Sequence, residues 1–163
     1  MVVLTRDMKR VVREQRLGFV ATVCPDGTPN LSPKGSTRVW DDDHLVFADA
    51  LSPRTIRNLV ERPAVEVNVV DPFRRRGYRF KGTGQVLRSG PEFQRIREMY
   101  KSDGADIHRI RAIVLITIKF AAPLDAPIYD SGIADAAVER SWEEYRERVR
   151  SGVPDPGHPI LDL

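Results

Sequence analysis

The residues best suited to chemistry in this chain are cations and hydroxyls gathered in two neighbouring segments. In the segment PKGSTRVW, Pro33 to Trp40, alternate positions hold Lys34, Ser36 and Arg38, so an extended strand would present all three on one face. A short acidic turn follows, and then His44 to Asp49 reads as an ordinary apolar strand. An ordinary half-buried strand would not line up two cations and a hydroxyl on one face, which raises the question of what they bind.

An anion seat is predicted at the helix start in LSPRTIRNLVERP. Ser52 suits the N-cap, Pro53 suits the first helical position, and apolar residues follow at helical spacing. The first amide groups of a helix lack intrahelical partners and favour negative charge. Arg54 and Thr55 fall in this turn, where the helix dipole disfavours a cation. A bound anion would compensate Arg54; an ordinary surface arginine is the alternative.

A basic run, FRRRGYRFK, extends from Phe73 to Lys81. Arg74 to Arg76 read as a solvated loop. Beyond Gly77 a strand would place aromatic side chains on one face and cations on the other: Tyr78 and Phe80 against Arg79 and Lys81. These cations could form a second phosphate clamp, face solvent, or contact nucleic acid through charge and stacking.

Motifs of the common catalytic classes do not occur in the sequence: there is no GxSxG, Walker loop, GxGxxG after a strand, or zinc-ligand spacing. The acidic run Asp41 to Asp43 is interpreted as a solvated turn rather than a cation site. Cys24 is the one cysteine, which excludes an internal disulfide, and we interpret it as a buried structural thiol. We assign no catalytic side chain and no metal ligand, so a bound cofactor would carry any chemistry.

Composition places the chain among globular proteins with a single domain, residues 1–163. It has 163 residues, 41% hydrophobic and 30% charged, with a formal charge of +3 that does not by itself indicate nucleic acid. No apolar run approaches the ~20 residues that cross a bilayer. The N-terminus lacks the apolar centre of a signal peptide, so we expect a cytoplasmic location and no membrane partner.

Periodicity predicts the elements that position these residues. Helices are expected over 5–15, 52–62, 91–100 and 136–150, and strands over 19–23, 30–40, 44–49, 65–69, 78–87 and 111–120. Gly82 and Gly84 suggest a bend or bulge. Sequential strands with short turns, interrupted by helices, favour an antiparallel barrel with helices around it. The last helix has an apolar stripe that packs on its own barrel or, alternatively, covers a neighbouring subunit: Val138, Trp142, Tyr145 and Val149.

An ordered set of segments carries a resemblance to a known family. The Pro-Asp-Gly turn, polar strand, acidic turn, LVFAD, SPRTIRNL and RPAVEVNV follow one another within residues 17–119. This arrangement resembles the FMN-binding core of the pyridoxamine 5′-phosphate oxidase-like split-barrel proteins. The resemblance implies a mainly β fold with helices (α+β): an antiparallel six-stranded split β-barrel of Greek-key type, flanked by helices. The core would span about residues 17–120, followed by the C-terminal helix and a tail.

The resemblance also implies a homodimer that binds FMN at the subunit interface. Arg54 and Thr55 would hold the phosphate where the family commonly has Arg-Lys, and Lys34, Arg79 or Lys81 would replace the charge that Thr55 lacks. The residues implied to bind the cofactor are Lys34, Gly35, Ser36, Thr37, Arg38, Ala48, Asp49, Arg54, Thr55, Arg79 and Lys81.

The expected function is therefore an FMN-dependent oxidoreductase that transfers hydride through flavin N5 to or from an unknown small molecule. A deazaflavin-dependent reductase on the same fold is the alternative. A third class is a non-catalytic flavin-binding protein, or a basic barrel that binds nucleic acid through residues 74–81. The oxidase that names the family uses an Arg-x-His near its C-terminus. Here His158 has no arginine two residues before it, so vitamin B6 oxidation is not expected.

Overall fold

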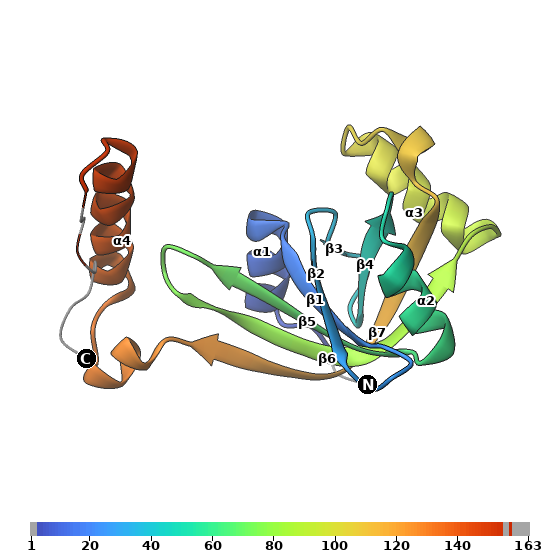
Figure 1. Ribbon diagram of the computed structural model, residues 1–163, viewed down its shortest axis with the longest axis horizontal. Coiled ribbons are helices and arrows are strands. Elements are labelled where there is room, and N and C mark those ends of the chain that lie inside the picture. The colour runs from blue at the N-terminus through green and yellow to red at the C-terminus, as the bar shows by residue number, and fades with distance from the viewer. Residues whose placement is uncertain (1–2, 155–156, 158–163) are drawn as a thin grey trace.

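The computed structural model describes residues 3–154 and residue 157. Seven strands form one antiparallel sheet in the order β2-β1-β5-β6-β7-β4-β3, curved into a split barrel with helices around it (Figure 1). The strands are β1 (Gly18–Val23), β2 (Pro29–Lys34), β3 (Arg38–Val39), β4 (His44–Asp49), β5 (Ala64–Asp71), β6 (Arg76–Leu87) and β7 (Ala112–Asp125). The α-helices are α1 (Arg6–Gln15), α2 (Pro53–Glu61), α3 (Pro91–Ser102) and α4 (Asp135–Arg150), with short 3-10 turns η1 (Ile107–Arg109) and η2 (Pro127–Ser131).

The fold class is confirmed, but the sheet has seven strands rather than six. The predicted strand over 30–40 breaks at Gly35 and Ser36, which form a turn. The Thr37 hydroxyl closes that turn by donating to the Lys34 carbonyl at 2.8 Å. Because β2 and β3 lie at opposite edges of the sheet, the turn carries the chain from one edge to the other. Lys34 and Arg38 therefore belong to different strands and do not share one strand face, contrary to the prediction.

The barrel interior is filled by strand residues of alternating exposure. In β5 the predicted set Val65, Val67 and Val69 is buried, while the positions between them are partly exposed or, at the strand's start, exposed. A register shift between Lys81 and Gly82 bends β6, as predicted from the glycine. A Cβ atom at Gly82 would lie 2.0 Å from the Thr117 carbonyl oxygen, so this close strand approach requires glycine.

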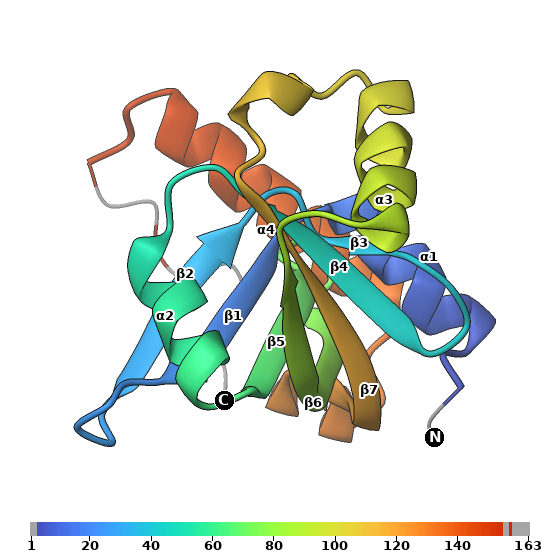
Figure 2. The ribbon, with the colours of Figure 1, turned by 90° about the vertical axis from the view of Figure 1, so that its right-hand side faces the viewer.

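Two helices cover the barrel where the candidate site is built. Figure 2 shows α2 beside β1, and α3 above β4. Ile56 and Leu59 of α2 belong to the main core, whereas Phe93, Ile96 and Tyr100 of α3 form a second apolar cluster with β4 and β7. The start of α2 and the end of α3 are therefore fixed rigidly to the sheet.

The C-terminal part of the chain forms an arm, residues 127–150, that stands away from the barrel (Figure 1). Helix α4 packs against the loop between β5 and β6. The first prediction, that it packs on the barrel wall, is wrong. The Arg75 guanidinium lies 4.4 Å from the Trp142 ring centroid, and Arg146 lies 4.2 Å from that of Phe73. These cation–aromatic contacts attach the helix to the hairpin tip.

None of the described helices is both long and apolar enough to span a membrane.

Candidate functional site

A buried lysine lies at the centre of the candidate site. Lys34 ends β2 with only 6% of its surface exposed. Its Nζ donates to Ser32 Oγ at 2.7 Å and to Ser52 Oγ at 2.5 Å. Among the described residues no carboxylate lies within ion-pairing distance of this ammonium. Burial lowers the pKa of Lys34, and the nearby Asp49 carboxylate opposes that shift.

The start of α2 lies beside this lysine, because its N-cap residue Ser52 contacts the lysine Nζ. Ser52 is the N-cap residue as predicted, but its side chain makes no capping hydrogen bond and instead accepts from Lys34. The first turn of α2 contains no acidic residue. Asp49 Oδ1 accepts from the Ser52 amide at 2.7 Å, which fixes the entry into the helix. A buried cation and a helix N-terminus thus converge from two elements.

Arg54 and Thr55 point in different directions from the first turn of α2. Arg54 is exposed and has no ion pair among the described residues. Thr55 is buried, and its Oγ1 accepts from Asn30 Nδ2 at 3.3 Å. The arginine is therefore available to an anion at the surface, whereas the threonine hydroxyl joins the polar groups that line the sheet.

A row of polar residues beneath α2 was missed from the sequence. Asn30 and Ser32 share the inward face of β2 with Lys34, and the buried Asn58 donates to Thr22 Oγ1 at 3.1 Å. The signal was the alternation of Asn30, Ser32 and Lys34 along the sequence. The predicted polar face began only at the last of these residues, Lys34. Cys24 is half-buried rather than buried, and its Sγ lies 3.5 Å from Asn58 Nδ2.

The turn that follows Lys34 is anchored by hydrogen bonds on two sides. Ser36 Oγ donates to the Ala48 carbonyl and accepts from the Ala48 amide, both at 3.0 Å. The buried Tyr100 hydroxyl of α3 donates to the Ser36 carbonyl at 2.7 Å, and burial raises the pKa of Tyr100. Around Gly35 the space is open, since a Cβ atom there would meet nothing within 4 Å. The turn therefore offers a fixed backbone with an accessible surface.

Arg38 points toward α3 rather than toward Lys34. Its Nε donates to Asp103 at 3.0 Å, its Nη1 donates to the Thr37 carbonyl at 2.9 Å, and the guanidinium lies 5.9 Å from the Tyr100 ring centroid. The structure does not bring the side chains of Arg38 and Lys34 together.

Arg79 and Lys81 lie on the outer face of the sheet. Both pair with Glu66, at 2.7 Å and 3.3 Å, while their strand neighbour Phe80 points into the core. Within one chain these cations are separated from Lys34 by the sheet, so they do not join the polar groups around Lys34.

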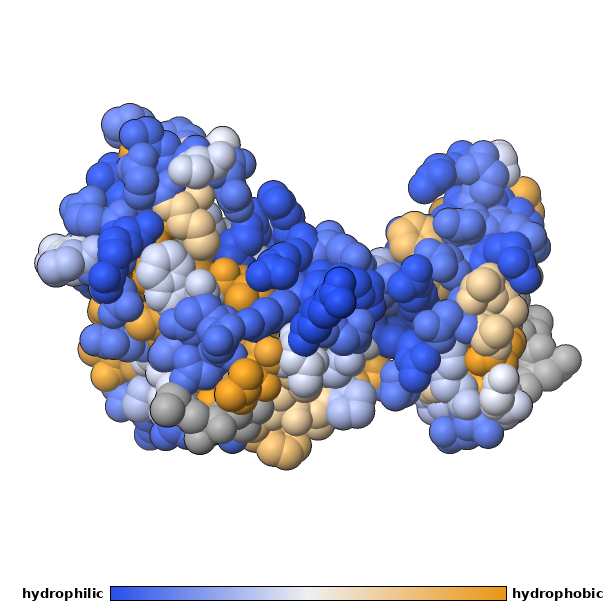
Figure 3. Space-filling model, turned by 180° about the vertical axis from the view of Figure 1, so that it is seen from behind, coloured by the Kyte–Doolittle hydropathy of each residue, from blue (hydrophilic) through white to orange (hydrophobic). Residues whose placement is uncertain are grey.

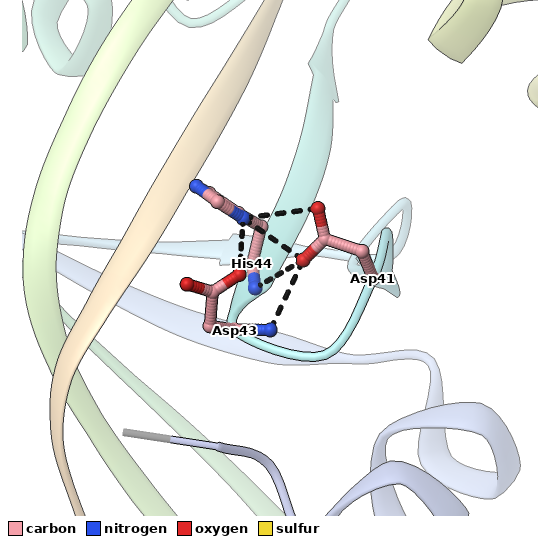
Figure 4. A group of neighbouring side chains, drawn as sticks. All are labelled: Asp41, Asp43 and His44. Atoms are coloured by element: carbon pink, nitrogen blue, oxygen red, sulfur yellow. Dashed lines mark hydrogen bonds and ion pairs between the residues drawn. The ribbon is translucent and has the colours of Figure 1, made fainter. Parts of the chain in front are cut away.

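The acidic turn before β4 gathers Asp41, Asp43 and His44 (Figure 4). One oxygen of each carboxylate lies 2.8 Å from His44 Nδ1, and Asp41 Oδ1 also accepts from the Asp43 and His44 amides. The carboxylates thus serve the turn, as predicted. The turn lies at the opposite end of β4 from Asp49, about 17 Å away along the strand.

Comparison with known proteins supports this architecture. The family model described as "Pyridoxamine 5'-phosphate oxidase" matches residues 4–122. The structure of Group A Streptococcus HupZ is 28% identical and covers 77% of this chain and 96% of that chain, with a TM-score of 0.68. An FMN-binding protein from Syntrophomonas wolfei is 17% identical, with 76% and 87% covered and a TM-score of 0.64. A structure named F420 reductase is 21% identical, with 72% and 98% covered and a TM-score of 0.57. Because the family model spans most of the chain, this protein belongs to the pyridoxamine 5′-phosphate oxidase family.

Proposed function

We propose that this chain binds the phosphate of FMN, or of its deazaflavin counterpart, at Lys34 and the start of α2. The loaded protein would act as a cytoplasmic oxidoreductase on a small molecule. The observation that carries the proposal is the burial of Lys34 without a paired carboxylate, beside a helix start whose N-cap side chain is turned away. A buried ammonium is costly unless an anion or hydrogen bonds compensate it, and a phosphate would supply the missing charge.

The residues present fit such a group. Lys34, Arg54 and the first amides of α2 would hold the phosphate, while Ser32 and Ser52 orient the lysine Nζ. The anchored turn at Gly35 to Thr37 would place its backbone against the polar edge of the ring. When bound, the flavin supplies reversible hydride transfer at N5. The chain supplies orientation and positive charge.

The two cofactors share the phosphate, so the seat accommodates both. The names of two structural neighbours, an FMN-binding protein and an F420 reductase, support one candidate each. The visible spectrum of the purified protein separates them: oxidised FMN gives two broad bands and a yellow colour, and deazaflavin gives one dominant violet band with strong fluorescence.

A nucleic-acid role for the basic run is less well supported than flavin binding. Three arginines of this run have carboxylate partners: Arg74 with Glu139, Arg76 with Asp125, and Arg79 with Glu66. Lys81 shares Glu66. Cations that are already paired release fewer counterions on binding a polyanion.

We further propose that a second copy of this chain covers one exposed apolar surface. Phe19 is 41% exposed and Leu31 65%, on the neighbouring strands β1 and β2. Phe120, 49% exposed on β7, lies on the same face beyond the Glu66–Lys81 ion pair. A hollow of about 680 Å³ between barrel and arm continues this surface past Phe19 to Leu17 and Leu124. In Figure 3 the molecular surface narrows between the barrel and the arm. Large exposed apolar side chains beside a hollow of this kind are typical of an interface.

The dimer is tested by sedimentation. We expect the wild type to sediment as a dimer, and Leu31→Asp to sediment as a folded monomer because it buries a charge in the interface. Val60→Asp, at an exposed apolar position of α2, is the control and should remain dimeric. A wild type that is monomeric at micromolar concentration contradicts the dimer proposal.

The phosphate seat is tested by titrating apoprotein with FMN and following quenching of flavin fluorescence. Arg54→Ala should bind FMN about 10- to 100-fold more weakly, if one charge-assisted hydrogen bond is lost. Arg13→Ala, which removes an exposed arginine from α1, should bind like the wild type. Unchanged affinity in Arg54→Ala would remove Arg54 from the site. Failure of the wild type to bind FMN or deazaflavin would refute the proposed function.

A further inference from the structure

The tip of the β5–β6 hairpin and helix α4 exchange two cation–aromatic contacts. The Arg75 guanidinium of the hairpin lies over the Trp142 ring of α4, and the Arg146 guanidinium of α4 lies over the Phe73 ring of the hairpin. Figure 1 shows the hairpin reaching toward α4. Trp142 and Arg146 are four residues apart, so they are neighbours on one face of the helix. The two contacts therefore lie next to each other, and both guanidiniums border the hollow between barrel and arm, which we call the arm hollow.

Neither of these two guanidiniums has a carboxylate within ion-pairing distance among the described residues. Their neighbours in the same basic run do have such partners: Arg74 pairs with Glu139, and Arg76 pairs with Asp125. Asp125 also lines the arm hollow, but its Oδ1 accepts from Arg76 Nε at 2.6 Å. Two positive charges held side by side repel each other unless an anion lies close to both. The arm hollow therefore carries positive charge that an external anion can neutralise.

The backbone of Arg75 is strained. Its φ of 58° makes it one of two non-glycine residues with positive φ in the described part of the chain. This left-handed region is disfavoured for a residue with a Cβ atom, and glycine would adopt it without strain. Backbone strain of this kind is typical of residues whose side chains serve a binding site.

The rest of the arm hollow is mainly apolar. Its volume is about 680 Å³, and Leu17, Phe19, Val70 and Leu124 line it together with the two guanidiniums. Small-molecule sites typically have volumes of about 300–1,000 Å³, with apolar walls and a few convergent polar groups. The lining residues Leu124 to Pro127 and Arg146 lie beyond residue 122, where the family match ends. The arm thus adds to the family core a hollow with the properties of a ligand site.

We propose that the arm hollow binds a small apolar molecule that carries a carboxylate. The carboxylate would lie between Arg75 and Arg146, because planar guanidiniums donate paired hydrogen bonds to its two oxygens. The stacked rings contact the faces of the guanidiniums and leave their N–H edges available. The apolar part would lie against Phe19 and Leu124. This site goes beyond the proposed function and does not depend on it, since none of its residues contacts Lys34.

Calorimetric titration of the 163-residue chain tests the site with naphthoate and with naphthamide, an uncharged analogue of nearly the same shape. The wild type should bind naphthoate about tenfold or more tightly than naphthamide, because charge-assisted hydrogen bonds favour the acid. Arg75→Met/Arg146→Met keeps an apolar stem on each ring but removes both charges, so it should bind the two probes with equal affinity. Arg13→Met/Arg140→Met, which replaces two exposed arginines outside the arm hollow, should behave like the wild type.

Equal affinity of the wild type for the two probes, or binding of neither, overturns the proposal. A preference for naphthoate that persists in Arg75→Met/Arg146→Met also overturns it. If circular dichroism shows that this double variant is unfolded, the single variant Arg75→Met decides: a reduced preference supports the site, and an unchanged preference overturns it. Naphthoate binding by a wild type that binds no flavin supports this site while the proposed function fails, and flavin binding without naphthoate binding gives the reverse.

A second copy of the chain is the other occupant that the two guanidiniums could serve. Sedimentation of Arg75→Met/Arg146→Met distinguishes it from a small molecule. A monomeric double variant, beside a dimeric wild type that does not bind naphthoate, would assign the guanidiniums to carboxylates of the second copy and overturn the proposal. A double variant that remains dimeric while it loses the preference for naphthoate supports the small-molecule site.

Discussion

Replacing Lys34 by methionine should lower cofactor affinity without destabilising the apoprotein. Methionine has a similar length, so it fills the space of the lysine stem. The substitution removes a buried cation, and burial lowers the pKa of Lys34 because it disfavours the charged form. It also leaves the Ser32 and Ser52 hydroxyls without their ammonium partner. Because these effects oppose each other, we expect the free energy of unfolding to change by less than about 1 kcal/mol.

The loss of affinity should be much larger. One charge-assisted hydrogen bond between Lys34 Nζ and a phosphate oxygen contributes about 1.5–3 kcal/mol. Since each 1.4 kcal/mol changes the dissociation constant about tenfold, Lys34→Met should bind FMN about 10- to 150-fold more weakly. A cation that serves only the fold would show the reverse: little change in affinity and a clear loss of stability.

Two measurements decide between these outcomes. Fluorescence titration gives the FMN dissociation constant, and urea unfolding of the apoprotein gives the free energy of unfolding. Lys119→Met, at an exposed lysine of β7, is the matched control and should alter neither quantity. An unchanged FMN affinity in Lys34→Met, or a destabilisation of about 3 kcal/mol or more, would refute the assignment of this lysine to the phosphate seat.

Three further results follow from the same contacts. A bound phosphate favours protonated Lys34, whose pKa in the free protein lies below its usual 10.5. FMN affinity measured across pH should therefore fall as the pH rises through that lowered pKa. Lys34→Met should show no such fall. Tyr100→Phe removes the 2.7 Å hydrogen bond to the Ser36 carbonyl and should lower the free energy of unfolding by about 1–2 kcal/mol, seen as a Tm about 2–8 °C lower. An unchanged Tm would show that this bond is not needed. Gly82→Ala places a Cβ 2.0 Å from the Thr117 carbonyl oxygen and should cost about 3 kcal/mol or more, whereas Gly35→Ala, with open space around it, should change the Tm little.

The local elements were readable from the sequence because their signals are local. Ser52 and Pro53 mark the start of α2, and the alternation of Val65, Val67 and Val69 marks a half-buried strand. The bend at Gly82 was readable for the same reason. The order of these segments was enough to indicate the family, which the match over residues 4–122 confirms.

The directions of the cationic side chains were not readable. The sequence suggested one face carrying Lys34, Ser36 and Arg38. The turn between β2 and β3 instead sends Lys34 toward Ser52, and it sends Arg38 toward Asp103. Each partner lies far along the chain and is brought close only by the sheet order. The placement of Arg38, Arg79 and Lys81 in a cofactor site stays a prediction.

By itself, the sequence determined which segments become helices and strands, since capping residues, glycines and hydrophobic periodicity act on neighbours a few positions away. The tertiary structure alone decided which cations stay free for a ligand. A charged side chain is neutralised by whatever carboxylate the fold brings within a few ångströms. The pairing of Arg79 with Glu66, and the hydrogen bonds of Lys34 to serines with no carboxylate of the described residues at ion-pairing distance, therefore depend on contacts between distant segments.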